Sequence, residues 1–179
     1  MSYSSKILIT LKGIRKEQIL SLILLVIPIN IYVIGSSIGS GLQTPLFKFQ
    51  MTGYGSFFIP VTSDLYYITS GHYKGQTALS TLLGVIGVCF LVSAILLLFL
   101  EMGAYDEIKK RVGIIIIIAG NLFLGSIIIQ YGPLFHGPAG IAIPIGLPVL
   151  FVVGGWMYWE GLKGKARDDR VQGIAGEIR

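Results

Sequence analysis

Four long apolar stretches dominate the sequence. They cover residues 18–38, 78–100, 112–131 and 139–159, and none has a Lys, Arg, Asp or Glu in its interior. Crossing roughly 30 Å of hydrocarbon takes about 20 helical residues, and each stretch reaches that length. In lipid the backbone must satisfy its own hydrogen bonds, as a helix does. The pattern therefore predicts an all-α membrane protein, built as a bundle of four transmembrane helices.

Composition supports this interpretation and excludes other classes. Mean hydropathy is +0.76 and charged residues make up 13% of the chain, about half of the roughly 25% typical of soluble proteins. A water-soluble domain and a disordered chain are therefore excluded. The net charge of +5 comes from cations near the predicted span ends rather than from a basic stripe. We therefore expect the lipid bilayer, and no nucleic acid, as a partner.

The placement of Lys and Arg predicts the orientation. Twelve of the 14 lie in the N-terminal segment 1–17, the loop 101–111 and the tail 160–179, whereas Lys48 and Lys74 lie in the loop 39–77. Cytoplasmic segments of membrane proteins carry the excess of Lys and Arg. We therefore expect a multi-pass protein of the cell membrane with both termini cytoplasmic, and with the loops 39–77 and 132–138 outside.

The N-terminal region leaves two questions open. Ile7, Leu8, Leu11 and Ile14 recur at helical spacing, which suits either a short interfacial helix or a frayed basic tail. The first span could also be a signal peptide cleaved after its small residues, giving a mature start near Ser40. The apolar run is longer than a usual signal-peptide core, which favours an uncleaved span.

The loop 39–77 is too long for a plain connector and predicts a small folded cap. Residues 46–52 alternate apolar and polar, as a strand does, and the Gly-rich residues 53–56 predict a turn. Residues 57–59 suit a second strand that stops at Pro60. Thr62 or Ser63 could cap a short helix that ends at Gly71.

Aromatic side chains are concentrated in this cap. A lone hairpin cannot bury them, so they must cover something else. They pack either on the outer span ends or, as a contact surface, on a partner subunit. The candidate partner surface comprises Phe47, Phe49, Phe57, Phe58, Tyr66, Tyr67 and Tyr73.

Two amides and two prolines are the candidate packing or pathway residues within the spans. Asn30 and Asn121 lie near mid-span, where an unpaired amide is costly, so they could hydrogen-bond to each other or line a polar path. Pro144 and Pro148 are expected to kink the outer half of the fourth span and free backbone carbonyls. Broken helices of this kind line substrate sites in some transporters.

Reactive chemistry is sparse in the sequence. His72, His136 and Asp64 fit no metal-ligand spacing, and the single Cys89 forms no redox motif. The sequence therefore predicts no cofactor, metal or catalytic set. Three functions remain: a non-catalytic accessory, assembly or scaffold subunit, which leads; a small transporter or channel component; and an inner-face lipid enzyme using Glu101, Asp106 or Glu160. The leading function implies a membrane protein partner or a homo-oligomer.

The predicted layout resembles that of claudin-like four-span proteins in outline. Both have cytoplasmic termini and a long, partly β outer loop between the first two spans. The loop here contains neither Trp nor Cys, and so lacks that family's tryptophan signature and cysteine pair. The resemblance therefore concerns the layout, and no function or residue is carried over from it.

Overall fold

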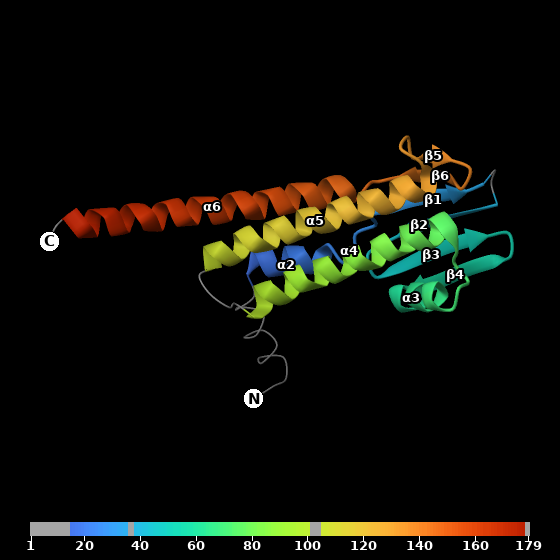
Figure 1. Ribbon diagram of the computed structural model, residues 1–179, viewed down its shortest axis with the longest axis horizontal. Coiled ribbons are helices and arrows are strands. Elements are labelled where there is room, and N and C mark those ends of the chain that lie inside the picture. The colour runs from blue at the N-terminus through green and yellow to red at the C-terminus, as the bar shows by residue number, and fades with distance from the viewer. Residues whose placement is uncertain (1–14, 36–37, 101–104, 178–179) are drawn as a thin grey trace, which may run out of the picture.

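The computed structural model describes residues 15–35, 38–100 and 105–177, with side-chain surroundings described up to residue 164. Within these residues the helices α2 (Lys16–Ile23), α4 (Gly75–Leu100), α5 (Tyr105–Tyr131) and α6 (Leu147–Glu177) form an elongated helical bundle, and a six-stranded antiparallel sheet with the short helix α3 (Val61–Thr69) lies at one end of it (Figure 1). The strands are β1 (Asn30–Ile34), β2 (Gly39–Gln43), β3 (Phe47–Thr52), β4 (Gly55–Pro60), β5 (His136–Gly137) and β6 (Gly140–Ile143).

The predicted four-helix, all-α membrane bundle is wrong. Among the described residues, two helices, α4 and α5, are long and apolar enough to cross a membrane. These correspond to the second and third predicted spans, 78–100 and 112–131. The first and fourth predicted spans each contain a short helical part and a strand of the sheet. The expected interfacial helix at residues 7–14 lies outside the described residues.

The first apolar stretch changes from helix to strand because of its proline and polar residues. Helix α2 ends at Ile23, and Pro28 cannot donate a backbone hydrogen bond to a continuing helix. Strand β1 then alternates buried and exposed positions, with Asn30 and Tyr32 buried. Gly35, with φ of 54°, turns the chain at the end of β1. A stretch of helix-like length is therefore divided between two kinds of structure.

The fourth apolar stretch is divided in the same way. It contributes β6, and α6 begins only at Leu147. The backbone N–H of Gly146 donates to the carbonyl oxygen of Ile29 at 3.0 Å, which ties the start of α6 to the segment before β1. The apolar part of α6 ends before Glu160, so it is about 20 Å long, too short to cross roughly 30 Å alone.

The sheet brings distant parts of the chain together. Its strand order is β4-β3-β2-β1-β6-β5, with every neighbouring pair antiparallel. The predicted hairpin and short helix of the loop 39–77 are confirmed as β3, β4 and α3, and Gly71 follows α3 with φ of 73°. The predicted helix cap at Thr62 or Ser63 is wrong, because α3 begins at Val61 and contains both residues. Sequence reasoning missed β1, β2, β5 and β6, which make the hairpin part of a larger sheet.

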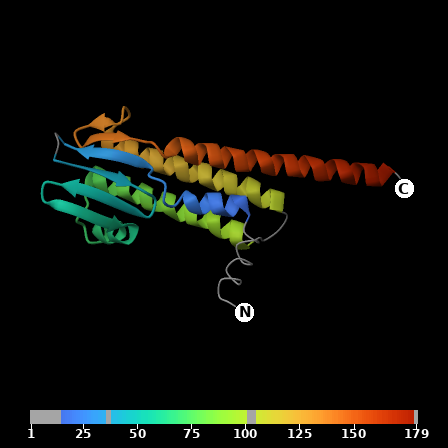
Figure 2. The ribbon, with the colours of Figure 1, turned by 180° about the vertical axis from the view of Figure 1, so that it is seen from behind.

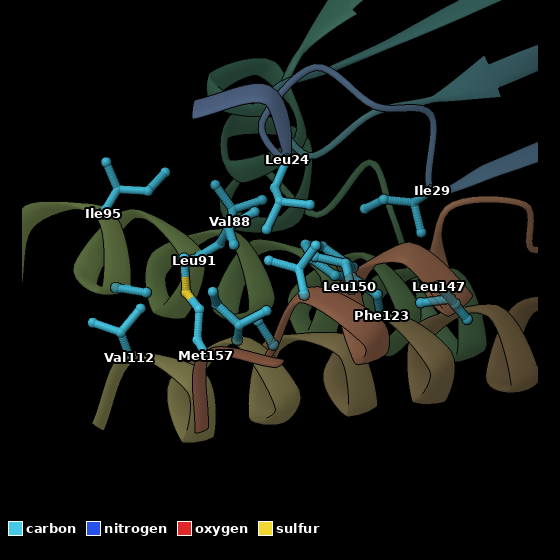
Figure 3. Close-up of a cluster of buried hydrophobic side chains, with 14 of the residues drawn as sticks. Leu24, Ile29, Val88, Leu91, Ile95, Val112, Phe123, Leu147, Leu150 and Met157 are labelled. Carbon is cyan, nitrogen blue, oxygen red and sulfur yellow. The ribbon is translucent and has the colours of Figure 1, made fainter. Parts of the chain in front are cut away.

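The core lies between the long helices. Leu91 of α4, Val112 and Ile116 of α5 and Met157 of α6 are almost fully buried against one another, and Figure 3 shows Met157 between the two other helices. Helix α2 lies along α4, where the Gln18 side chain donates from Nε2 to the carbonyl oxygen of Leu98 at 3.0 Å. The view from behind shows α2 beside the end of the bundle away from the sheet (Figure 2).

Candidate functional site

The two faces of the sheet differ in chemistry. Alternation along the strands and the pairing register assign each residue to a face. The outer face, turned away from the helices, carries Ile31, Val33, Ser40, Leu42, Phe47, Phe49, Met51, Ser56, Phe58, Pro60, Ile141 and Ile143. The inner face carries Asn30, Tyr32, Gln43, Lys48 and Gln50. Ile34, Phe57, Ile59 and Ala142 share the inner face with these residues. The outer face therefore contains no charged residue, and the inner face carries the amides and the lysine of the sheet.

Much of the apolar outer face is exposed. Phe58 is 62% exposed, Ile143 58% and Met51 55%. Ile31 and Val33 at the centre of the sheet are also exposed, at 44% and 39%. Soluble monomers rarely expose contiguous apolar patches larger than a few hundred Å², and larger ones mark contact sites. This face is therefore the strongest candidate contact surface in the described part of the chain.

The structure separates the aromatic residues that the sequence grouped together. Phe47, Phe49 and Phe58 share the outer face, with 5.0 Å between the ring centroids of Phe47 and Phe58. Phe57 pairs with Gln50 on the opposite face of the sheet. Tyr66 and Tyr67 lie on α3 beside His72, and Tyr73 lines a cavity.

A polar cavity of about 260 Å³ lies between the inner face of the sheet and the ends of α4 and α5. From the sheet come Asn30, Tyr32, Ile34, Gln43, Lys48, Gln50 and Ile59; from α4 and its preceding loop come Tyr73, Thr77, Ser80 and Thr81; from α5 come Ser126, Ile127, Gln130 and Tyr131; Ala139 completes the lining. Of these lining residues, the sequence analysis named Asn30 and Tyr73 as candidate site residues.

Short side chains allow α4, α5 and the sheet to approach one another closely next to this cavity. Ser80 of α4 donates from Oγ to the carbonyl oxygen of Ser126 on α5 at 2.9 Å. A Cβ at Gly84, one turn further along α4, would lie 3.6 Å from Ser126 Oγ and 3.9 Å from Gln43 Nε2. Ser80 and Gly84 therefore lie where α4, α5 and the sheet come together.

Asn30 has an unsatisfied hydrogen-bonding atom in the cavity wall. The residue is 1% exposed. Its Nδ2 donates to Gln43 Oε1 over a long 3.4 Å, and its Oδ1 has no hydrogen-bond partner among the described residues. A buried acceptor left unpaired costs free energy comparable to a lost hydrogen bond. Asn30 therefore lines the cavity with an amide whose buried carbonyl oxygen accepts nothing from the described residues.

A buried ion pair forms another part of the wall. Lys48 Nζ of β3 lies 2.8 Å from Asp64 Oδ2 of α3, and their side chains are 18% and 7% exposed. Burial, and next the negative charge of Asp64, raise the pKa of Tyr32 to about 12. The same two causes, in the same order, raise the pKa of Tyr73 to about 12. The pair leaves no net charge on this wall, and both tyrosines keep their protons at neutral pH.

The other predicted pathway residues lie apart from the cavity. Asn121 is exposed on α5 and donates from Nδ2 to the carbonyl oxygen of Ile117 at 2.9 Å, so the expected bond between Asn30 and Asn121 is absent. Pro144 lies between β6 and α6, and Pro148 lies in the first turn of α6. A helix tolerates proline in its first turn, because those N–H groups have no intrahelical partner. The expected kink is therefore wrong.

The acidic residues considered for an enzyme lie at the far end of the helices. Asp106 Oδ1 lies 3.4 Å from Lys109 Nζ, and Glu107 Oε1 lies 2.7 Å from an Arg111 Nη. Glu160 lies within α6, and Glu101 is outside the described residues. Asp106 and Glu107 thus pair along α5, and in the described part of the chain no three His, Cys, Asp or Glu could hold a metal.

Glu17 anchors α2 at this end of the bundle. It is 5% exposed and accepts a hydrogen bond from the Tyr105 hydroxyl at 3.1 Å. The Arg15 guanidinium lies 3.8 Å from the centre of the Tyr105 ring. These contacts attach the start of α2 to α5. We assign them a structural role.

Comparisons with known proteins give no assignment. The chain matches no family model. It also has no match among curated proteins.

Proposed function

We propose that this chain is a non-catalytic, multi-pass integral membrane protein that works as a self-associating scaffold. Helices α4 and α5 would cross the bilayer, because their exposed side chains, such as Leu96, Phe99 and Ile118, are apolar. Lys109, Lys110 and Arg111 near the start of α5 favour a cytoplasmic location for that end. Helix α2 starts and α6 ends on the same side in Figure 1, which supports cytoplasmic termini. The sheet would then lie on the outside.

The observation that carries the scaffold proposal is the sidedness of the sheet. An antiparallel sheet with one face in water normally turns its polar residues to that face. Here the exposed face is apolar, and the polar residues line the cavity. The apolar side chains must therefore meet something other than water. Lipid alone does not fit, because the sheet extends past the ends of α4 and α5 (Figures 1 and 2).

We assign this surface to a second copy of the chain. The face has no charged residue, so two copies meet without like-charge repulsion. Sheets of equal twist stack face to face at about 10 Å with interdigitating side chains. A two-fold axis makes such a contact self-complementary. Leu22, Ile23 and Val26 at the helical end are also exposed and apolar, so a membrane-embedded copy could meet them as well.

Photocrosslinking of the full chain in lipid nanodiscs tests this proposal. A benzoylphenylalanine replaces Phe58 on the outer face or, as the control, Phe57 on the opposite face of the same strand. We expect an adduct of twice 19.4 kDa from position 58 and little from position 57. Val33→Lys, which places a charge at the centre of the outer face, should abolish the adduct.

Three results would overturn the self-association. They are equal yields from positions 57 and 58, no adduct from either position, and an adduct with a different protein when the reaction is run in native membranes. A Val33→Lys chain that still crosslinks with wild-type yield would refute the assignment of the contact to the outer face.

A further inference from the structure

We infer that the cavity between the sheet and the ends of α4 and α5 binds one uncharged, polyhydroxylated group, such as a sugar ring or a polyol. The inference is independent of the scaffold proposal, because the cavity lies on the other face of the sheet. Its basis is the combination of wall chemistry, absence of net charge, an unfilled acceptor and size.

The cavity wall is rich in groups that both donate and accept hydrogen bonds. Asn30, Gln43, Gln50 and Gln130 each contribute an amide, and they come from β1, β2, β3 and α5. An amide offers two N–H donors and a carbonyl acceptor. Hydroxyl groups of a ligand likewise donate and accept, so a polyol matches several amides at once. A purely apolar ligand would leave these amides unpaired.

Charge on the wall disfavours an ionic ligand. Lys48 lines the cavity, but its ammonium group is paired with Asp64 at 2.8 Å. An anion would have to compete with Asp64 for Lys48, and a cation would meet Lys48. Separating a buried ion pair is costly, because the remaining charge stays without compensation. The site therefore favours a ligand without net charge.

Asn30 supplies the feature that points to a ligand rather than to a plain polar core. Its Oδ1 is buried and has no partner among the described residues, although the surrounding wall is rich in hydrogen-bonding groups. A small rotation of the Asn30 side chain, which is held only by the long contact to Gln43, would present this acceptor to an O–H group in the cavity. The weak 3.4 Å contact from its Nδ2 to Gln43 leaves both amides able to engage a ligand.

The size of the cavity and its aromatic surface further limit which ligands would fit. A volume of about 260 Å³ is below the roughly 300 Å³ at which pockets for drug-sized ligands begin. Tyr32 and Tyr131 lie with ring centroids 6.4 Å apart and both border the cavity. Their rings, with Ile59 and Ile127, offer apolar surface for the C–H groups of a sugar ring. The site therefore suits a single ring.

The group can reach the cavity from two sources, and the experiment separates them. The full chain in phosphatidylcholine nanodiscs is titrated with glucose and with myo-inositol, followed by saturation-transfer NMR. In a second arm, monoglucosyl-diacylglycerol or plain diacylglycerol is added to the nanodiscs, and thermal unfolding is measured. Binding of the free compounds indicates a soluble ligand. A stabilisation by the glycolipid alone indicates a lipid headgroup.

Matched substitutions test the site. Asn30→Leu removes the unfilled acceptor, and we expect it to weaken binding at least tenfold. Asn121→Leu makes the same replacement at an exposed position outside the cavity and should leave binding unchanged. Gln130→Ala, at a partly exposed cavity position, provides a second variant if Asn30→Leu fails to fold, and it should weaken binding severalfold.

The inference is overturned if none of the probes binds the wild-type chain, which would leave a water-filled cavity. It is also overturned if Asn30→Leu and Gln130→Ala bind as tightly as the wild type. Tighter binding of acetate or choline than of glucose and inositol would overturn the assignment of an uncharged ligand.

Discussion

The contact between α5 and α6 gives the sharpest stability prediction. Gly113 of α5 faces Gly154 and Tyr158 of α6. A Cβ added at Gly113 would lie 2.5 Å from the carbonyl oxygen of Gly154 and 2.5 Å from the backbone nitrogen of Tyr158. Both neighbours are backbone atoms of a helix, so neither can rotate away. Gly113→Ala therefore forces the two helices apart.

The magnitude follows from the size of this overlap. Ordinary contacts of a Cβ begin at 3.4 Å, so α6 must shift by roughly 0.9 Å at this point, which forfeits close contacts nearby. Overpacking costs about 1–3 kcal/mol, and a rigid backbone neighbour favours the upper end. Alanine recovers about 1 kcal/mol through its higher helix propensity. We expect Gly113→Ala to lower the free energy of unfolding by about 2 kcal/mol.

Intrinsic fluorescence reports on this contact directly. The two tryptophans of the chain, Trp156 and Trp159, both lie on α6. Unfolding in mild detergent with added denaturant, followed by tryptophan emission, therefore follows the separation of α6 from the bundle. The Gly113→Ala chain should lose its native emission at a lower denaturant concentration than the wild type.

Gly155→Ala is the matched control. Gly155 lies on the same helix as Gly154, but a Cβ there would meet nothing within 4 Å. This variant should be as stable as the wild type or up to about 1 kcal/mol more stable. The reasoning is refuted if Gly113→Ala unfolds at the wild-type midpoint, or if both variants shift equally.

Three further predictions concern the sheet and its surroundings. Asp64→Asn should destabilise the fold by about 3 kcal/mol, because Lys48 then stays buried without its partner. Adding Lys48→Met to this variant should restore part of the lost stability, as measured by thermal unfolding. The raised pKa of Tyr32, about 12, means that the folded state keeps a proton that the unfolded state releases near pH 10. The free energy of unfolding, measured by chemical denaturation, should therefore fall from pH 10 towards pH 12. The fall should be smaller in the Tyr32→Phe variant. Pro148→Ala should change the free energy of unfolding, measured by the same chemical denaturation, by less than about 1 kcal/mol. If Pro148 kinked the helix, the change would be larger.

The parts of the fold that could be predicted are those with one consistent pattern. Residues 78–100 contain no proline and no charged residue and form most of α4, and the alternation in 46–52 corresponds to β3. The stretches 18–38 and 139–159 were misassigned, because an apolar run fits both a helix and a strand buried in a sheet. Their length favoured a helix, whereas Pro28 and Pro144 mark where regular helix is absent. The positions of these prolines therefore indicated the local structure better than the length of the apolar stretches did.

The cavity was beyond sequence reasoning for a different reason. Its amides at positions 30, 43, 50 and 130 are far apart in sequence. They converge only because β1 pairs with β2, β2 pairs with β3, and the inner face of the sheet lies on the end of α5. Lys48 and Gln50 at alternate positions of a predicted strand did indicate one polar face. No local pattern in the sequence indicated that this face turns towards the helices.

The alternation of β1 places neighbouring residues on opposite surfaces of the sheet. Asn30 and Tyr32 face the cavity, while Ile31 and Val33 belong to the outer face. A slip of the register by one residue would exchange the two sets, exposing the amide and burying the isoleucine in the polar cavity. Gly41 disfavours such a slip, because a Cβ there would lie 2.6 Å from the Tyr32 hydroxyl oxygen. The same alternation separates the two proposals: Val33→Lys acts on the outer face and leaves the cavity wall intact, whereas Asn30→Leu acts on the cavity and leaves the outer face intact. If either substitution abolished both crosslinking and ligand binding, the two faces would not be independent, and the sheet would be acting as a single cooperative unit.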